Sequence, residues 1–148
     1  MKMMNNSMNH SMNNSTNHYL VMLVIMIISG LLTTMNLYVD KISDIRLSLN
    51  DLYMTLVMTS WMFLFMGIYN QQRDIIIYSI ISLLGSIWAI RSQFLISKNQ
   101  YLQGMIPHHS MAVHMSKKLL EKDISIKSFL DNIINTQNTE IEFMKTQQ

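Results

Sequence analysis

The chain contains no cysteine, and only one proline and four glycines are found among its 148 residues. The lack of cysteine excludes disulfide bonds, thiolate zinc sites and thiol nucleophiles. The few isolated glycines form no glycine-rich loop that could hold a phosphate group. Charged residues are also scarce, at 14% of the chain, and the net charge is only +2. Because the chain also has no run of lysine or arginine, a nucleic-acid partner is not expected.

The apolar residues fall into three blocks of low charge. The first block, residues 19–39, is long enough to cross about 30 Å of hydrocarbon, and the second covers residues 52–69. The third, residues 75–91, is short and must borrow flanking residues or thin the bilayer. The first block is too long for a signal peptide, and no basic leader or small-residue cleavage pattern accompanies it. We therefore predict an all-α protein with three transmembrane helices.

Residues 1–18 form a polar tail rich in methionine, asparagine and serine. The tail has no apolar periodicity, so we expect it to be disordered without a ligand. Two interpretations remain open, a metal-capture tail and an inert leader with a biased composition. A capture tail would use Met3, Met4, Met8, His10 and Met12.

The remaining segment, residues 92–148, is predicted to form a helical hairpin. Its first helix is expected over residues 92–120, with an interruption or kink at Pro107, because proline removes a backbone donor and clashes with the preceding turn. A turn over residues 121–124 would then lead to a second helix over residues 125–146.

Histidine and methionine are concentrated in the first helix of this hairpin. Thioether and imidazole groups suit soft metal ions such as Cu(I), whereas Mg²⁺ and Ca²⁺ prefer oxygen. At 100° per residue, Met105, His108 and Met115 share one stripe of the helix, and His114 points away from it. The candidate ligands on this helix are Met105, His108, His109, Met111, His114 and Met115.

The second helix carries polar residues on the stripe that should be buried. Gln137 and Glu140 lie there together with Met144. A buried carboxylate is costly unless a cation or a hydrogen-bond donor accompanies it. Across the hairpin, Glu140 could accept a hydrogen bond from an imidazole N–H or ligate a metal itself. Each residue alone could be an ordinary cap or core residue, but their joint occurrence favours a metal site.

These residues resemble the signature of the family called domain of unknown function 305. The upstream part also resembles membrane-anchored members, which have a His/Met-rich leader and three spans. The chain departs from the family pattern at Met111 and Ser116, where small residues and alanine are usual. The matching residues are Met105-Ile106-Pro107-His108-His109, Ala112-Val113, Met115, Ile133-Ile134, Gln137, Glu140-Ile141 and Met144.

The resemblance implies a ferritin-like helical domain similar to CopM-like copper-binding proteins. It implies binding of copper, or of silver, and a non-catalytic role in metal handling or tolerance, with a copper export or chaperone partner. The implied ligands are, first, His108, His109, Met105 and Met115, and, second, Met111, His114, Glu140 and Met144.

A hairpin with a single copy of the motif is half of a four-helix bundle and cannot bury much core by itself. We therefore expect a homodimer that completes the bundle.

Two other function classes remain as alternatives. A ferritin-like metal-dependent oxidase would need inward carboxylates in Glu-x-x-His motifs, and neither Glu140 nor Glu142 has a histidine three residues later. In the other alternative, the chain is a structural small membrane protein that binds no metal, and its histidines have no functional role.

Two features of the sequence give different predictions for the side of the membrane on which the C-terminal domain lies. The distribution of lysine and arginine places the C-terminal domain in the cytoplasm. The resemblance instead implies the outer side of a bacterial-type inner membrane, where a thiol-free site is also reasonable, and we favour this second prediction.

Overall fold

The computed structural model describes residues 18–148, and every regular element in this range is a helix. The first helix is described from residue 18, and its regular part ends at residue 32. The predicted all-α class is therefore confirmed for the described residues. The elements that follow are η1 (Met35–Tyr38), η2 (Ile42–Asp44), α2 (Leu49–Tyr69), α3 (Arg73–Ser92), α4 (Lys98–Leu120) and α5 (Lys127–Thr146).

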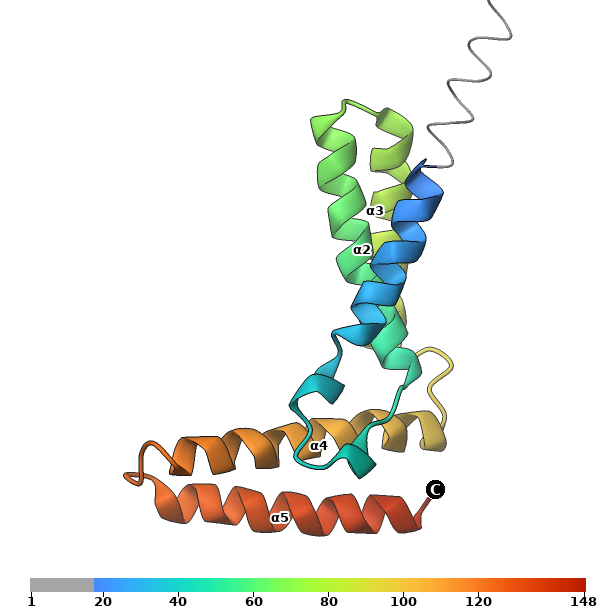
Figure 1. Ribbon diagram of the computed structural model, residues 1–148. Coiled ribbons are helices and arrows are strands. Elements are labelled where there is room, and N and C mark those ends of the chain that lie inside the picture. Colours follow the sequence, from blue (N-terminus) through green and yellow to red (C-terminus); the bar gives the residue numbers. More distant parts are fainter. Residues whose placement is uncertain (1–17) are drawn as a thin grey trace, which may run out of the picture.

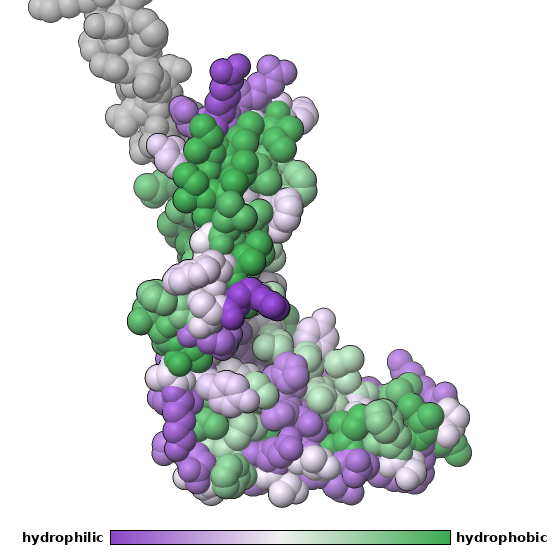
Figure 2. Space-filling model, turned by 180° about the vertical axis from the view of Figure 1, so that it is seen from behind, coloured by the Kyte–Doolittle hydropathy of each residue, from purple (hydrophilic) through white to green (hydrophobic). Residues whose placement is uncertain are grey.

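Three segments are long and apolar enough to cross a membrane, namely His18–Tyr38, Leu49–Tyr69 and Arg73–Ser92. They stand side by side as an upright bundle (Figure 1), and the bundle surface seen in Figure 2 is largely hydrophobic. These bounds agree with the three predicted spans. The first differs in one respect, because its regular helix gives way after residue 32 to a turn and then to η1.

Small and hydroxyl-bearing side chains mediate the contacts inside this bundle. A Cβ atom on Gly30 would overlap the side chain of Thr55 on α2, so the first helix approaches α2 closely there. The hydroxyl oxygens of Ser60 on α2 and Ser82 on α3 lie 2.8 Å apart. Close approach at small residues and interhelical hydrogen bonds are the usual means of packing helices in lipid.

The beginning of α2 is joined directly to α4. Ser48 and Asp51 form a capping box, in which the Ser48 backbone N–H donates to the Asp51 carboxylate at 2.8 Å. The next backbone N–H, that of Leu49, donates to Gln100 Oε1 of α4 at 2.7 Å. An uncapped helix end leaves donors unsatisfied, so these bonds stabilise α2 and also fix α4 beside its first turn.

A short non-helical segment separates α3 from α4, whereas the sequence predicted a helix that starts at residue 92. Gln93 ends α3 in the left-handed conformation with φ 50°, and Leu95 also has a positive φ of 57°. The Ser97 hydroxyl then accepts from the Gln100 N–H at 3.3 Å and caps the new helix. The predicted helix start at residue 92 is therefore wrong, because the chain turns there out of the bundle. Of the predicted interruption or kink at Pro107, the interruption is absent, since α4 runs through this residue.

The two last helices form an antiparallel hairpin that lies across the foot of the bundle, which makes the molecule L-shaped (Figure 1). Ile106 and Val113 of α4 have no exposed surface and are the centre of the hairpin core. Burying a side chain of this kind stabilises a fold by about 1.5–3 kcal/mol. The core cluster consists of Leu102, Ile106, Val113, Ile141 and Met144.

Candidate metal centre

The hairpin brings His109 of α4 next to Glu140 of α5. The His109 Nε2 atom lies 3.5 Å from Glu140 Oε2, an ion-pair distance that is longer than a good hydrogen bond. The His109 side chain is 14% exposed and that of Glu140 is 49% exposed, so the contact lies at the rim of the helix interface. This is the pairing across the hairpin that the sequence predicted.

Two polar atoms in the same interface are buried without a hydrogen-bond partner in the protein. They are the second ring nitrogen of His109, Nδ1, and the side-chain oxygen of Gln137, Oε1. Gln137 precedes Glu140 by three residues, or about one turn, on α5. Leaving such atoms unpaired costs about 1–3 kcal/mol each. An imidazole nitrogen and an amide oxygen are both metal donors, so each of these buried atoms is a candidate ligand.

The surroundings of His109 favour its neutral imidazole. Burial lowers the pKa of His109, the Glu140 carboxylate raises it, and His108 lowers it, with a net pKa below 6.5. A histidine must be neutral to ligate a metal ion. The lowered pKa of His109 therefore favours the form of the side chain that a metal site requires.

Two methionines lie one helical turn from the His109–Glu140 contact, away from the turn that joins α4 and α5. Met144 is 7% exposed within the core cluster, and Met105 packs against that cluster. Met105 precedes His109 by one turn, and Met144 follows Glu140 by one turn. Because the helices are antiparallel, backward along α4 and forward along α5 are the same direction in space. Both methionines therefore lie on the same side of the His109–Glu140 contact.

The other predicted ligands are not brought to this place. His108 is exposed, although its ring centre is 5.9 Å from that of His109. Met115 is 56% exposed and lies about 9 Å further along the helix axis. His114 and Met115 line a separate cavity near the far end of the hairpin. Met111 is half-buried and does not belong to the core cluster.

The stripe of Met105, His108 and Met115, which was expected to face the hairpin interior, is not the buried face of α4, because His108 and Met115 are exposed. The prediction assumed that α4 packs only against α5. In the structure α4 also contacts η1, η2 and α2. The buried face of α4 is turned accordingly and is made by Leu102, Ile106, Pro107, Ser110, Val113 and Ser116.

Within residues 18–148, no three histidine, aspartate or glutamate side chains gather in an arrangement that could hold a metal ion. A site at His109 would depend on methionine sulfur as well. The residues that a metal-capture tail would use, Met3, Met4, Met8, His10 and Met12, lie outside the described residues.

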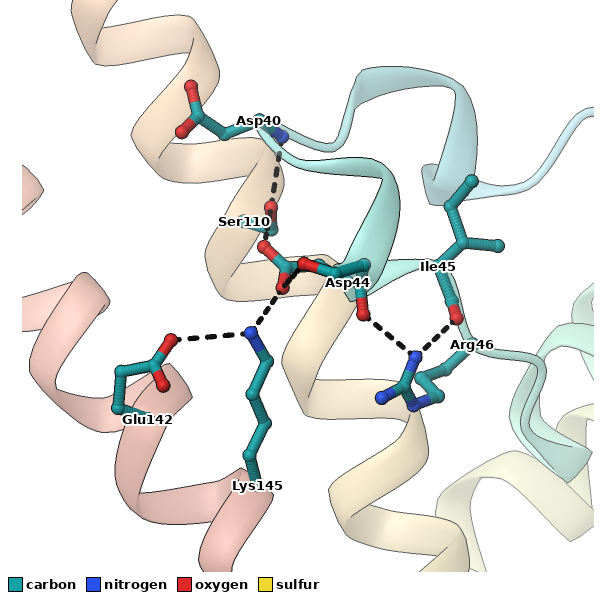
Figure 3. A network of polar contacts seen from close by, with 8 residues as sticks. Asp40, Asp44, Ile45, Arg46, Ser110, Glu142 and Lys145 are labelled. Carbon is teal, nitrogen blue, oxygen red and sulfur yellow. Dashed lines mark hydrogen bonds and ion pairs between the residues drawn. The ribbon is translucent and has the colours of Figure 1, made fainter.

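A buried polar network beside the hairpin was not predicted from the sequence (Figure 3). Asp44, at the end of η2, is 1% exposed. Its carboxylate accepts from the Ser110 hydroxyl of α4 at 2.7 Å and lies 2.7 Å from the Lys145 ammonium of α5. The Ser110 oxygen in turn accepts from the Asp40 backbone N–H at 2.9 Å. One loop residue thus joins both hairpin helices to the segment that follows the first span.

The charges in this network are mutually stabilised. Burial raises the pKa of Asp44, but the hydrogen bonds from Lys145 and Ser110 outweigh this effect and leave the pKa below 3.8. The hydrogen bond to Asp44 raises the pKa of Lys145 above 10.5. A second ion pair, Lys117 with Asp40 at 2.7 Å, lies on the same face of α4. The only signal of the Asp44 contact in the sequence is Ser110. It continues the spacing of the buried residues Leu102 and Ile106, but its side chain is polar.

The fold and the site define a class of protein: three helices of membrane-spanning length lead into a two-helix hairpin that holds a histidine against a glutamate. The hairpin and the residues just before it, 95–148, match the family described as Domain of unknown function (DUF305).

A relative matches almost the whole chain. It is the uncharacterized protein L153 of Acanthamoeba polyphaga mimivirus, with 44% identity over 153 residues, which covers 97% of this chain and 92% of the relative. The chain belongs to the DUF305 family. No solved structure matches it.

Proposed function

We propose that this protein binds Cu(I), or the chemically similar Ag(I), at its C-terminal hairpin and serves non-catalytically in metal handling or tolerance. The observation that carries the proposal is the buried, unpartnered Nδ1 atom of His109. It lies in an interface that also contains Met105 and Met144.

The position of Glu140 distinguishes the two ring nitrogens of His109. Because the Glu140 carboxylate is next to Nε2, it favours the tautomer with the proton on Nε2. The lone pair of Nδ1 then faces the helix interface and is free to bind an ion. A carboxylate that orients a ligating histidine in this way is a common feature of metal sites.

The available donors favour a soft ion. The thioethers of Met105 and Met144, with the imidazole of His109, are ligands that suit Cu(I). His108 would reach the site only by a change of rotamer, because its side chain is exposed. We assign Met111, His114 and Met115 no role in this site.

Anaerobic titration with Cu(I) against a competing chelator tests the proposal on the full chain in detergent micelles. Met105→Leu and Met144→Leu remove sulfur at nearly constant volume, and His109→Gln removes the imidazole. We expect each to weaken Cu(I) binding by tenfold or more, and Glu140→Gln to weaken it by about tenfold. The matched controls, Met115→Leu and His114→Gln, should bind like the wild type.

The alternatives give different results in the same experiment. A structural protein would retain no copper, and an oxidase would prefer iron and consume oxygen. If the wild type holds Cu(I) but X-ray absorption finds neither sulfur nor nitrogen around it, the assigned site is wrong.

We also propose that two copies associate through their hairpins. Phe129 and Phe143 of α5 are 61% and 64% exposed, although they are large apolar side chains. A second hairpin would cover them and complete a four-helix bundle. Crosslinking in mild detergent should give a dimer, and Phe143→Ser should reduce it. Monomer alone at all concentrations would contradict this part of the proposal.

We further propose that the hairpin lies on the outer side of a membrane, where it would pass copper to an export or chaperone partner. The support is the thiol-free composition and the family resemblance. Protease protection of sealed vesicles tests the orientation, since the hairpin would be cleaved from the outer side only.

A further inference from the structure

The far end of the hairpin extends sideways from the bundle. In Figure 1, α4 passes beneath the spans and continues beyond them, toward the turn that leads to α5. Near its beginning, α4 is bonded to α2 through Leu49 N and Gln100 Oε1. Further along, Ser110 and Lys117 of α4 contact the segment that follows the first span. The second half of α4 lies against η1 at Tyr38 and then continues beyond the spans (Figure 1).

The level of α4 relative to the bilayer follows from this anchoring. The 21 residues of α2 rise about 31 Å, which is the thickness of the hydrocarbon core. Because α4 contacts the first residue of α2, it lies just outside the hydrocarbon, in the layer of the lipid headgroups. The overhanging half of α4 then runs along the membrane surface.

A cavity of about 570 Å³ opens at this overhang. Tyr38, the last residue of the first candidate span, forms part of its wall. Since Tyr38 marks the end of a span, the cavity lies at the membrane surface. The apolar side chains that line it are Met115, Leu119 and Leu130, and its cationic side chains are Lys118 and Lys122.

The two lysines differ in whether an acidic side chain neutralises them. Lys118 forms an ion pair with Glu121 at 2.8 Å. Lys122 belongs to no ion pair in the part of the chain that the structure describes. Lysine stems cover apolar surface while their ammonium groups reach the headgroup layer. The cavity thus combines an apolar lining with an unneutralised positive charge.

We propose that this cavity binds the headgroup of an anionic phospholipid from the same bilayer. The phosphate would approach Lys122 and Lys118, and the upper acyl carbons would contact Met115 and Leu119. The exposed side chains at the hairpin turn, Ile124 at 73% and Ile126 at 46%, continue this apolar surface and would enter the interface beside it. The proposal assigns Met115 and His114 to a lipid site and is independent of copper.

The test uses the full chain in two kinds of nanodisc, phosphatidylcholine alone and phosphatidylcholine with phosphatidylglycerol. Hydrogen exchange is measured at the amides of residues 114–124. Anionic lipid should slow exchange there, and native mass spectrometry should find phosphatidylglycerol retained on the protein. Lys122→Gln should reduce retention about fivefold, since one lysine near an anionic surface contributes an affinity factor of this size.

Lys127→Gln is the matched control, because Lys127 is also an exposed lysine near the turn but pairs with Asp131 and does not line the cavity. It should retain phosphatidylglycerol like the wild type. Equal exchange in both nanodiscs, or equal loss in both variants, would overturn the proposal. Protection by inorganic phosphate in neutral micelles would also overturn it, because the ligand would then be a free anion.

Discussion

At the scale of single residues, three features of its environment set the pKa of His109, and they do not all act in the same direction. Burial lowers its pKa, the adjacent Glu140 carboxylate raises it, and His108 lowers it. The net pKa is below the usual 6.5, so the folded protein disfavours the protonated ring. The neutral ring therefore contributes stability that is fully present above pH 6.5 and is lost as the pH falls through the lowered pKa.

Substitutions around His109 should move its pKa in opposite directions. Glu140→Gln removes the attraction for the imidazolium and should lower the pKa further. His108→Gln removes a repulsion and should raise it. NMR titration of the full chain with ¹³C-labelled histidine measures both shifts, and His109→Gln identifies the resonance. A shift of the same sign in both variants would contradict this account of the site.

At the scale of elements, the segment after the first span binds the hairpin to the bundle. Asp44 contributes a buried carboxylate that contacts α4 through Ser110 and α5 through Lys145. Removing one partner of a buried ion pair leaves the other charge uncompensated. The stability of the hairpin therefore depends on a residue that lies outside it.

Asp44→Asn should lower the free energy of opening of the hairpin by about 3 kcal/mol. This value is at the lower end of the range for such pairs, because Lys145 keeps partial contact with water and its ion pair with Glu142. Native-state hydrogen exchange at the amides of α4 and α5 measures this change. In the wild type the contribution is fully present above pH 3.8 and is lost as the pH falls through the lowered pKa of Asp44.

Asp131→Asn provides the control for this experiment, because Asp131 forms an exposed i,i+4 ion pair with Lys127 on the same hairpin. Its loss should cost about 0.5 kcal/mol or less. Equal effects of Asp44→Asn and Asp131→Asn would show that the buried network does not hold the hairpin.

At the scale of the whole molecule, the shape depends on how closely the spans approach one another. The first helix can meet α2 at Gly30 only because no side chain intervenes. Gly85 on α3, in contrast, has no atom within 4 Å of the place where a Cβ would lie. The two glycines thus have different roles, although both lie in apolar segments.

Gly30→Val should therefore destabilise the bundle by about 1–3 kcal/mol through overpacking. Gly85→Val adds a side chain to open space and should change stability by about 0.5 kcal/mol or less. Thermal unfolding in mild detergent, followed by circular dichroism, compares the two variants. If Gly85→Val lowers the melting temperature as much as Gly30→Val does, the close contact at Thr55 is not the cause.

Much of the architecture was predictable from the sequence because it rests on local properties. Long apolar blocks with few charges form helices of spanning length wherever they occur, and the helix over Lys127–Thr146 follows from its periodicity. The contact of His109 with Glu140 was also predictable, because helical spacing and a short turn place both near the middle of the hairpin.

The sequence alone determined the number of candidate spans, the all-helical class and the concentration of histidine and methionine in one helix, since each depends on neighbouring residues. Only the tertiary structure decided which face of α4 is buried, that Met115 and His114 lie apart from His109, and that Asp44 holds the hairpin. These outcomes depend on the loop after the first span, which packs against α4 from 66 residues away in the chain. Helical periodicity describes one element at a time and carries no information about such a distant partner.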